Sequence, residues 1–524
     1  MATFYAQSGV APGGNGSLAA PFNNLGTSWP GVTAGDTVRL VAGSYFRESF
    51  TALNFAGLTI EGWGAGPLPV VSGANIVTSW TPQGGGIFSW SAGSNLCGNV
   101  AMNGQPMLWK AWAGSLGATA LEPGAFSFDF TGFVLYVRPP DGIVTGKTFS
   151  VSVRPVLLDE DTTRDGFVLR NVRFEQASRH AVAILNCTNW LVEDCEFQLV
   201  GGFRDPGTYV GNAVEVAAAS SDGIGRRLRM KDIFDAAVTS QLYEVAPTVL
   251  RRNHWSDITV DGAGLAGCEF NTLTANQTLS DMRATRIHAR NIGITGWLSL
   301  RTGVDGYGVG VINIGGASSS IDRVVIEGCD IETTRYGVIS SSSTNGPTNV
   351  LVRGNRIKGL GSLADDQHQG VRLVNSGPTL ESNLISGFWA GVNTAGGTSY
   401  TVNVRNNEMD GNLRHFFRNA EFANYVATNN VLQGSTQIYG SNFVGGFSGS
   451  KNALFGNAAT GSEYSSTADI TLPSAVTIGA GLRLGSALIR AGAAVARGRD
   501  IRGVLRHPTT PTIGAFEAAR LWRA

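Results

Sequence analysis

The sequence predicts an all-β fold in which short strands stack, coil above coil, as a parallel β-solenoid. The first observation is a recurring asparagine that an apolar residue follows two positions later, as Asn355 and Ile357 do in the stretch VLVRGNRIKGL. The same pairing occurs at Asn253/Trp255, Asn383/Ile385, Asn407/Met409 and Asn430/Leu432, and Cys329, Cys195 and Val172 fill the asparagine position elsewhere. Neighbouring pairs from Cys329 onward lie 23–28 residues apart, and a period of this length indicates a repeat architecture.

Composition is the second observation, because it suits stacked strands and tight turns. The chain has 524 residues, of which 70 are glycine, and only 15% of the residues are charged. Many glycines and few charges favour turns and strands over helices. A solenoid also accommodates this length in one architecture, since each coil contacts only its neighbours.

The repeated asparagine is expected at a turn between two strands of a coil. Asparagine tolerates left-handed backbone angles and bonds neighbouring backbone groups, which favours it in turns. Stacked strands lie about 4.8 Å apart, so equivalent asparagines can form a ladder of amide hydrogen bonds.

The chain is expected to have four parts. Residues 1–75 are interpreted as an N-terminal cap with the first coils. Residues 76–155 break the period and contain Asn-Gly and Pro-Asp-Gly turns, which predict a β-rich insertion. Residues 156–440 form the main solenoid, and residues 441–524, where the period fades, are predicted to form a small C-terminal end domain.

Charge balance and cysteine usage exclude several classes of protein. Lys plus Arg and Asp plus Glu both total 39, so neither nucleic acid nor an anionic membrane surface is expected as a partner. No apolar run reaches the ~18 residues that would span a bilayer. The five cysteines lack metal-ligand spacing and are expected as free buried thiols, and no metal or other cofactor is expected.

Three stretches resemble right-handed parallel β-helix proteins of the pectate-lyase-like superfamily. They are the opening FYAQSGVAPGGNGSLAAPFNNL…AGDTVRLVAGSYFRE, the stretch MNGQPM…EPGAFSFDFTGFVLYVRPPDG, and the ending SALIRAGAAVARGRDIRGVLRHPTTPTIGAFEA. The resemblance implies a right-handed parallel β-helix that holds a carbohydrate polymer along one face. The superfamily includes polysaccharide lyases, glycoside hydrolases, acyl esterases and phage tailspikes, so the fold alone does not select a reaction.

Candidate catalytic residues come from a short motif in each coil, in which the third residue is expected to point outward. The motif gives Glu215 in AVEV and Glu269 in GCEF, and Asp235 lies just before the strand between them. Other coils place Ala183, Thr239, Ile339, Arg372 and Asn393 at this position. Glycoside hydrolysis needs two carboxylates roughly 5–9.5 Å apart, so Glu215, Asp235 and Glu269 are the predicted catalytic residues. The alternative is that these carboxylates only keep a solvent-facing sheet soluble.

Candidate binding residues lie on two stretched coils and on the later strands. The loops GGFRDPGTYVGN and GITGWLSLRTGVDGYG mix aromatic with charged residues, a combination that suits sugar rings and their hydroxyl groups. Further along, two arginines and a histidine are placed where a lyase would neutralise a uronate carboxylate. The predicted substrate-binding residues are therefore Arg204, Tyr209, Trp297, Tyr307, Arg335, Arg372 and His368. Three tryptophans in strand positions, Trp190, Trp255 and Trp389, are predicted to be core residues.

These observations predict a protein that binds and cleaves a polysaccharide, with a phage tailspike-type depolymerase as the first hypothesis. The N-terminal MATFYAQSGVAPGGNGS has neither the basic nor the apolar segment of a signal peptide, which favours a virion tail component. A glycoside hydrolase is favoured over a lyase. The alternatives are a secreted bacterial hydrolase or lyase and a non-catalytic carbohydrate-binding spike. A homotrimer located outside the cell is expected, since multivalent binding benefits from a parallel trimer.

Overall fold

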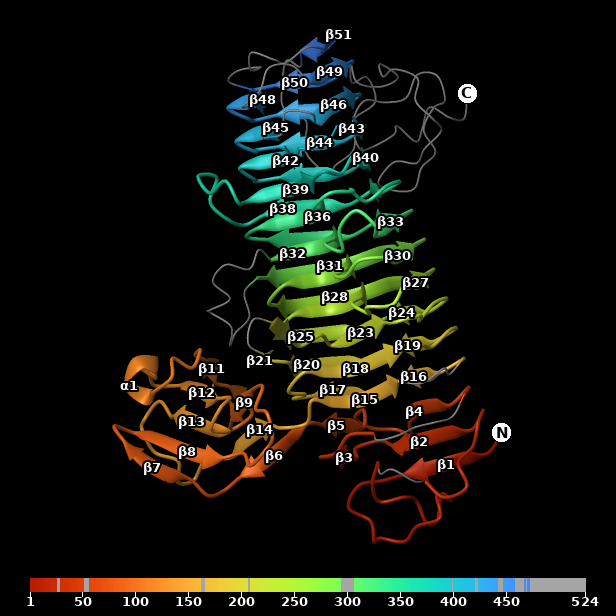
Figure 1. The fold of residues 1–524 in the computed structure, drawn as a ribbon, viewed down its shortest axis with the longest axis vertical. Coiled ribbons are helices and arrows are strands. Elements are labelled where there is room, and N and C mark those ends of the chain that lie inside the picture. The colour runs from red at the N-terminus through yellow and green to blue at the C-terminus, as the bar shows by residue number, and fades with distance from the viewer. Residues whose placement is uncertain are drawn as a thin grey trace. The chain divides into compact units, whose positions relative to one another are not determined.

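The computed structural model describes residues 1–25, 29–50, 56–161, 165–205, 208–293, 306–397, 399–419, 423–441, 446–457, 466–467 and 469–471. Apart from one short helix, α1 (Leu116–Thr119), the regular elements of these residues are β-strands (Figure 1). The chain is a right-handed parallel β-helix, as predicted. It divides into two compact units: Met1–Ser240, Ile258–Ala266 and Gly293–Val304 form the first, and Gln241–Asp257, Gly267–Ile292 and Asp305–Ala524 the second.

Three parallel ladders build the coils of the first unit. One ladder contains β1 (Thr3–Ala6), β2 (Thr37–Val41), β4 (Thr59–Trp63), β16 (Val168–Arg170), β19 (Leu191–Glu193) and β24 (Ile224–Arg226). The next contains β3 (Tyr45–Phe46), β5 (Val70–Ser72), β17 (Arg173–Glu175), β20 (Glu196–Val200), β25 (Arg229–Ile233) and part of β28 (His254–Ala263). The third contains β15 (Val156–Asp161), β18 (His180–Leu185), β23 (Val214–Ala217) and β26 (Ala236–Leu242). A hairpin of β21 (Phe203–Asp205) and β22 (Thr208–Val210) adjoins them in sequence.

An inserted segment interrupts the coils of the first unit. Strand β5 pairs directly with β17, although the chain between β5 and β15 forms two small sheets with mostly antiparallel pairings. The four-stranded sheet contains β6 (Ala74–Val77), β9 (Val100–Met102), β10 (Gln105–Pro106) and β14 (Phe149–Ser152). The five-stranded sheet contains β7 (Thr81–Gly84), β8 (Ile87–Ser91), β11 (Leu108–Trp109), β12 (Ala125–Asp129) and β13 (Val134–Arg138). The division of the whole chain at residues 75, 155 and 440 stays a prediction, and most of the predicted end domain lies outside the described residues.

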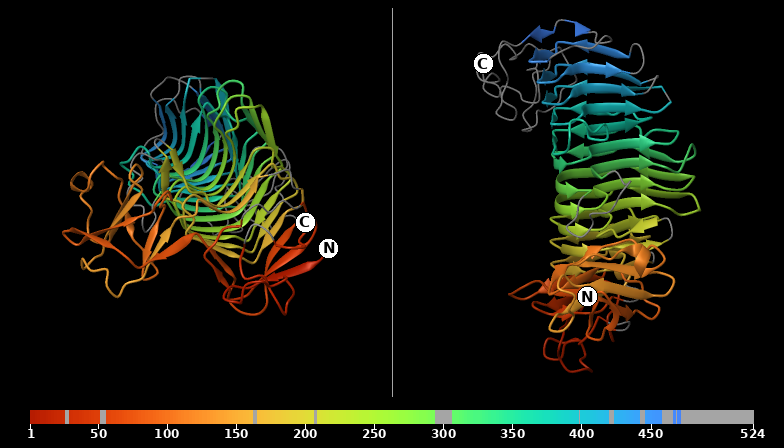
Figure 2. Two further views of the ribbon diagram at one scale, coloured as in Figure 1. Left: turned by 60° about the horizontal axis from the view of Figure 1, so that its bottom comes forward. Right: turned by 90° about the vertical axis from the view of Figure 1, so that its left-hand side faces the viewer.

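Parallel ladders also build the second unit, where strands of successive coils lie side by side (Figure 2). One ladder contains β31 (Arg283–Ile292), β34 (Val325–Glu327), β37 (Leu351–Arg353), β40 (Thr379–Glu381), β43 (Tyr400–Arg405), β46 (Ala423–Thr428), β49 (Phe447–Ser450) and β51 (Ser466–Thr467). A second, also starting from β31, contains β35 (Asp330–Thr333), β38 (Arg356–Gly359), β41 (Leu384–Ser386), β44 (Glu408–Asp410), β47 (Val431–Gln433), β50 (Ala453–Phe455) and β52 (Ile470–Thr471). A third contains β29 (Ala266–Thr272), β32 (Tyr307–Asn313), β36 (Tyr336–Ser342), β39 (Gln369–Val374), β42 (Ala390–Ala395), β45 (Arg414–Asn419) and β48 (Gln437–Ser441). A short fourth contains β27 (Thr248–Arg251), β30 (Gln277–Ser280) and β33 (Ser320–Asp322).

The repeated asparagines form the predicted ladder inside the second unit. Their amide groups are linked in sequence, with Nδ2 of Asn355 3.0 Å from Oδ1 of Asn383 and Nδ2 of Asn383 2.9 Å from Oδ1 of Asn407. Asn430 and Asn452 continue the chain of bonds at 3.1 and 3.0 Å, and all five side chains are fully buried. Each amide therefore satisfies backbone and side-chain groups that no solvent reaches.

The expectation that these asparagines themselves adopt left-handed angles is wrong. The left-handed residue is the one immediately before, such as Ser382 with φ of 58° and Asn406 with φ of 58°. That residue turns the chain between two strands, and the following asparagine is thereby directed into the interior. Turning and ladder formation are thus shared between two adjacent residues.

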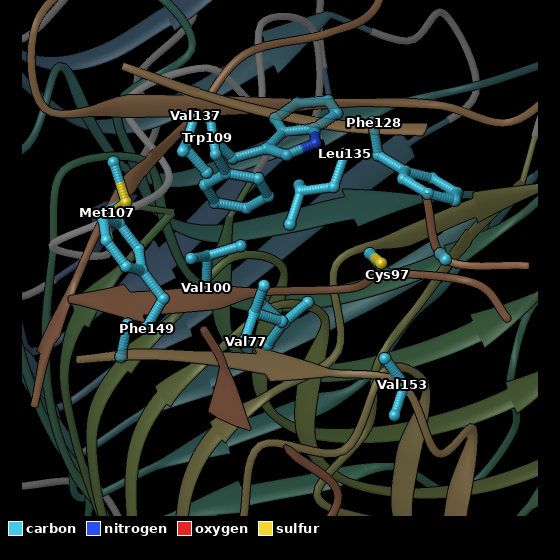
Figure 3. Close-up of a cluster of buried hydrophobic side chains, with 14 of the residues drawn as sticks. Val77, Cys97, Val100, Met107, Trp109, Phe128, Leu135, Val137, Phe149 and Val153 are labelled. Carbon is cyan, nitrogen blue, oxygen red and sulfur yellow. The ribbon is translucent and has the colours of Figure 1, made fainter. Parts of the chain in front are cut away.

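The inserted segment packs on the coils of the first unit through one apolar cluster and one buried asparagine. Figure 3 shows Trp109, Phe128 and Leu135 in this cluster, which also contains Leu199 and Phe234 from the coils. Nδ2 of Asn99 donates hydrogen bonds to three carbonyl oxygens of the coils, those of Ala177, Leu199 and Gly201, at 2.9–3.1 Å. Since Asn99 is only 1% exposed, these bonds fix the insertion against the coils.

Replacing Asn99 with alanine should weaken this docking. Two buried N–H donors, one of them shared between two carbonyl oxygens, lose their bonds, and at about 0.5–1.5 kcal/mol each the free energy of unfolding should fall by about 1–3 kcal/mol. Urea denaturation measures the loss, and Asn95→Ala is the matched control because, among the described residues, its amide bonds only the nearby carbonyl of Ala92. Equal unfolding midpoints for the two variants would contradict a docking role for Asn99.

All five cysteines are free and buried, as predicted. Burial alone raises the pKa of the Cys97 thiol, which keeps it protonated and unreactive near neutral pH. Within the described ranges, no helix is both long and apolar enough to cross a membrane.

Candidate functional site

Glu215, the first predicted catalytic residue, lies in β23 of the first unit. The register aligns it with Ala183 on one neighbouring strand and Thr239 on the other, which is the predicted column. Its side chain is only 4% exposed, so the expectation of a solvent-facing carboxylate is wrong. One of its oxygens, Oε2, accepts a hydrogen bond from Nδ2 of Asn212 at 2.9 Å and lies 3.3 Å from Nε2 of His180.

Asn212 connects this carboxylate to the neighbouring coils. Its backbone N–H donates to Nδ1 of His180 at 3.2 Å, and its Oδ1 accepts from the backbone N–H of Ala236 at 3.1 Å. Asp235, the second predicted catalytic residue, directly precedes Ala236 and is 8% exposed. Glu215 and His180 are thus joined through Asn212 in one polar cluster of the first unit, and Asp235 lies on the next coil.

Glu269, the third predicted catalytic residue, lies in β29 within the second unit. Its Oε1 accepts hydrogen bonds from the hydroxyl of Tyr307 at 2.6 Å and from Nδ2 of Asn271 at 3.1 Å. Two donors on one oxygen stabilise the ionised carboxylate. Tyr307, predicted to line a groove, is only 3% exposed and donates to Glu269, and its role in substrate binding stays a prediction. The joint catalytic role of the three carboxylates, which do not all belong to one unit, stays a prediction.

Arg372, a predicted binding residue, is part of a hydrogen-bonded group on β36 and β39. Its Nη1 donates to the hydroxyl of Tyr336 at 2.6 Å and to Oε1 of Gln367 at 3.1 Å. Its guanidinium also lies 5.0 Å from the centre of the Tyr336 ring. The next position, 337, requires glycine, because a Cβ there would lie 2.2 Å from Cγ2 of Ile357 in the interior.

A column of outward residues continues from Arg372 along the later strands. In the order of the strands, the register aligns Ile339, Arg372, Asn393, Phe417 and Gly440. Beside this column lie Trp389 and Arg414, both half-buried. We call the outward side of β36, β39, β42 and β45 the β36–β45 face; it comprises Arg372, Asn393, Trp389, Arg414 and Phe417, and the fully buried Tyr336 supports Arg372 through its hydroxyl.

Two aromatic rings and a guanidinium pack together at one end of this face. The rings of Trp389 and Phe417 meet edge to face with centroids 4.8 Å apart. The Arg414 guanidinium lies 4.8 Å from the Trp389 ring and 5.3 Å from the Phe417 ring, and its Nε donates to Oε1 of Gln437 at 3.2 Å. A Cβ at Gly440 would lie 3.0–3.1 Å from Arg414 and Phe417, so glycine leaves room for both side chains.

Two polar atoms on the β36–β45 face are buried without a hydrogen-bond partner among the described residues. They are Oδ1 of Asn393 and Nη1 of Arg414. Buried polar groups in native proteins are nearly always bonded to protein, water or ligand, so each unpaired atom requires an explanation.

Arg335 and His368, also predicted to bind substrate, have different surroundings. Nη1 of Arg335 lies 3.2 Å from Oδ2 of Asp365, and since both side chains are more than a third exposed this ion pair stabilises little. His368 is fully buried, packs against the Phe388 ring at 4.7 Å, and accepts a hydrogen bond from the Gly361 N–H at 3.2 Å. Burial lowers its pKa, which favours the neutral ring. We therefore leave His368 out of the β36–β45 face, and its role in binding stays a prediction.

The remaining binding candidates lie on the two long loops. Arg204 and Tyr209 pair with each other in the hairpin of β21 and β22, but their side chains lie outside the described residues. Trp297 lies wholly outside them. The involvement of all three in binding stays a prediction.

The motif that located Arg372 and Asn393 also contains Phe417, which was not predicted to be a site residue. One coil further on, the strand reads HFFR, and its third position is Phe417. Bulky residues occupy all four positions there, which hides the alternation of inward and outward residues. Trp190 and Trp255 are buried as predicted, but the prediction of a core position is wrong for Trp389, which is half-buried beside Arg414.

His415, which lies between Arg414 and the inward-facing Phe416, should make the protein less stable in acid. It is completely buried, and burial lowers its pKa to about 4 from the ordinary 6.5. The unfolded chain therefore takes up a proton below pH 6.5 that the folded protein does not accept until about pH 4. Stability should fall across this window at ~1.4 kcal/mol per pH unit, for a total of about 3 kcal/mol. Denaturation curves of the parent and of His415→Gln between pH 7 and 4 measure this, and identical slopes would contradict it.

Comparison with solved structures shows the fold. No family model and no curated protein sequence matches the chain. The complex structure of XylC with xylose is 11% identical over 98% of both chains, with a TM-score of 0.58. Pectate lyase Pel9A is 12% identical over 99% of this chain and 96% of its own, with a TM-score of 0.42. A mutant tailspike protein of E. coli bacteriophage HK620, in complex with a pentasaccharide, is 11% identical over 90% and 70%, with a TM-score of 0.39. At these identities the likeness shows the fold alone, a right-handed parallel β-helix.

Proposed function

We propose that the protein binds a polysaccharide along the β36–β45 face of its second unit. One observation carries this proposal: polar atoms of Asn393 and Arg414 are buried on this face without a partner among the described residues. They lie beside the half-buried rings of Trp389 and Phe417. Aromatic rings offer an apolar surface to the C–H faces of sugar rings, while guanidinium and amide groups bond their hydroxyl groups.

The charge of the face adds a preference for acidic groups on the polymer. Arg372 and Arg414 make no ion pair with any carboxylate in the described part of the chain. An uncompensated guanidinium binds a carboxylate strongly and with defined geometry. Consecutive strands are about 4.8 Å apart, so the two arginines, separated by one intervening strand, can contact successive parts of an extended polymer.

Cleavage of the bound polymer is the second part of the proposal. Glycoside hydrolysis is supported by the buried carboxylates Glu215, Asp235 and Glu269, because it needs one acid and one base or nucleophile. A polysaccharide lyase is the other candidate, and the uncompensated arginines favour it, since a lyase must neutralise the uronate carboxylate before a proton is removed.

The finer form of the proposal is a tailspike-type depolymerase that acts outside the cell as a homotrimer. It rests on the sequence and on the likeness of fold. A secreted enzyme with the same binding face is the alternative. Light scattering measures the mass of the particle in solution and so tests for a trimer. A monomer mass at working concentration would count against the trimer.

Products distinguish the reactions in one experiment. The protein is incubated with a panel of bacterial exopolysaccharides and plant or algal glycans. New reducing ends without absorbance from unsaturated uronates indicate a hydrolase. New reducing ends together with this absorbance indicate a lyase. Binding without products supports the carbohydrate-binding spike, and neither binding nor products from any polymer would overturn the proposal.

Variants of the three carboxylates then locate the chemistry. For a hydrolase, at least one of Glu215→Gln, Asp235→Asn and Glu269→Gln should lower turnover by ~10²–10⁴-fold. Because these side chains are buried, thermal melting must first show that each variant folds. Glu327→Gln is the control, since Glu327 forms a part-exposed ion pair with Arg353. Parent-like turnover in all three variants would exclude these residues from catalysis.

A further inference from the structure

A hollow of about 280 Å³ lies in the first unit beside the docked insertion. The first coils contribute Tyr45, Arg47, Arg173 and Glu175 to its lining, and the insertion contributes Thr148 and Ser150. The proposed binding face of the second unit shares no residue with it.

Arg47 presents a positive charge to this hollow. Its guanidinium lies 4.6 Å from the centre of the Tyr45 ring, and Nη1 donates to the Ala74 carbonyl at 3.4 Å. It forms no ion pair with a carboxylate in the described part of the chain. Stacking on one ring fixes the guanidinium while its remaining N–H groups stay available.

Arg173 is held in place by the other polar residues of the hollow. Its Nη2 lies 3.0 Å from Oε2 of Glu175 and donates to Oε1 of Gln198 at 2.6 Å. The hydroxyl of Tyr45 donates to the other oxygen of Glu175. Burial, followed by the charge of Glu175, raises the pKa of Tyr45 to about 12, so the phenol keeps this proton at neutral pH. Glu175 is therefore engaged on both oxygens.

The guanidinium groups of Arg47 and Arg173 and the carboxylate of Glu175 together give the hollow a net charge of +1. The walls are fixed, because Nε2 of Gln176 donates to the Ser150 carbonyl at 3.3 Å and Asn99 bonds the insertion to the coils. The volume lies just below the ~300–1,000 Å³ of pockets that hold drug-sized ligands, so the hollow suits a single sugar-sized group. Thr148 and Ser150 add hydroxyl groups that can bond those of a sugar.

We propose that this hollow binds one acidic sugar residue, with its carboxylate between Arg47 and Arg173. Bonds between a guanidinium and a carboxylate are about twice as strong as those between neutral groups, so the carboxylate should dominate recognition. The site is independent of the proposed function, because it uses other residues in the other unit.

Titration of the full-length protein with D-glucuronate, followed by ligand-detected NMR, tests this proposal. Saturable binding is expected for the parent, with D-glucose and acetate each binding at least about tenfold more weakly, since each lacks half of the recognised group. Arg47→Gln and Arg173→Gln should each weaken glucuronate binding about tenfold or more, as expected for loss of a charged hydrogen bond. Arg227→Gln, at an exposed ion pair outside the hollow, should bind like the parent.

Three results would overturn the proposal. They are the absence of saturable glucuronate binding, equal binding of glucuronate and acetate, and parent-like binding by Arg47→Gln. Arg47→Gln remains decisive even if Arg173→Gln fails to fold, because Arg47 makes one long backbone hydrogen bond and no ion pair in the described structure. Failure here, together with intact binding of a polymer at the β36–β45 face, would reject this site while leaving the proposed function untouched.

Discussion

Replacing Asn383 with leucine is expected to lower the free energy of unfolding by about 2–6 kcal/mol. Its Oδ1 accepts hydrogen bonds from both the backbone N–H and Nδ2 of Asn355, and its Nδ2 donates to the Val352 carbonyl and to Asn407. Leucine has a similar size but leaves at least two buried polar groups unpaired, and each costs about 1–3 kcal/mol. Guanidinium denaturation gives the change in free energy.

Asn424→Leu is the matched control for this substitution. Asn424 is an exposed asparagine in β46 of the same unit, so its replacement by leucine should change stability little. If Asn383→Leu unfolded at the same denaturant concentration as Asn424→Leu, the amide ladder would not be a source of stability.

Substitutions on the β36–β45 face are expected to cause the largest functional losses. For any polymer that the parent binds, Phe417→Ala and Arg372→Gln should each raise the dissociation constant about ten- to hundredfold. The first removes an aromatic contact of the kind that dominates binding energy, and the second removes a charged hydrogen bond. Affinity electrophoresis in gels containing the polymer measures both.

Arg353→Gln controls for the general effect of losing one positive charge. Arg353 lies in β37, outside the binding face, and pairs with Glu327. The Arg353→Gln variant should bind the polymer as tightly as the parent does. Equal loss of affinity in Arg353→Gln and Arg372→Gln would mean that the polymer responds only to net charge.

The stacking of coils could be predicted from sequence because one asparagine marks each of several successive coils. A second set of asparagines, the buried Asn412 and the partly buried Asn457, was not predicted. Asn412 accepts from the Phe388 N–H, and Asn457 accepts from Ser435, so a serine interrupts the pattern at the position between them. Because the residue type at this position changes from coil to coil, the sequence shows no regular spacing of asparagines there.

The candidate site could be predicted only in part, because burial depends on residues distant in sequence. The outward motif placed Glu215 correctly in its column, but His180 and Asn212 cover it, and His180 precedes it by a whole coil. The docking of the insertion by Asn99 was also hidden, since its partners lie 78–102 residues away. Sequence periodicity predicts whether a strand residue points inward or outward. It does not predict which residues of other coils cover that residue.

Hydroxyl-radical footprinting with a bound polymer is the most direct test of binding at the β36–β45 face. Oxidation of Trp389 and Phe417 should fall when the polymer is added, because the sugar rings cover these side chains. Tyr243, an aromatic side chain of the same unit that is 40% exposed, should be oxidised equally with and without the polymer. Unchanged oxidation of Trp389 and Phe417 at a saturating polymer concentration would contradict binding at the β36–β45 face.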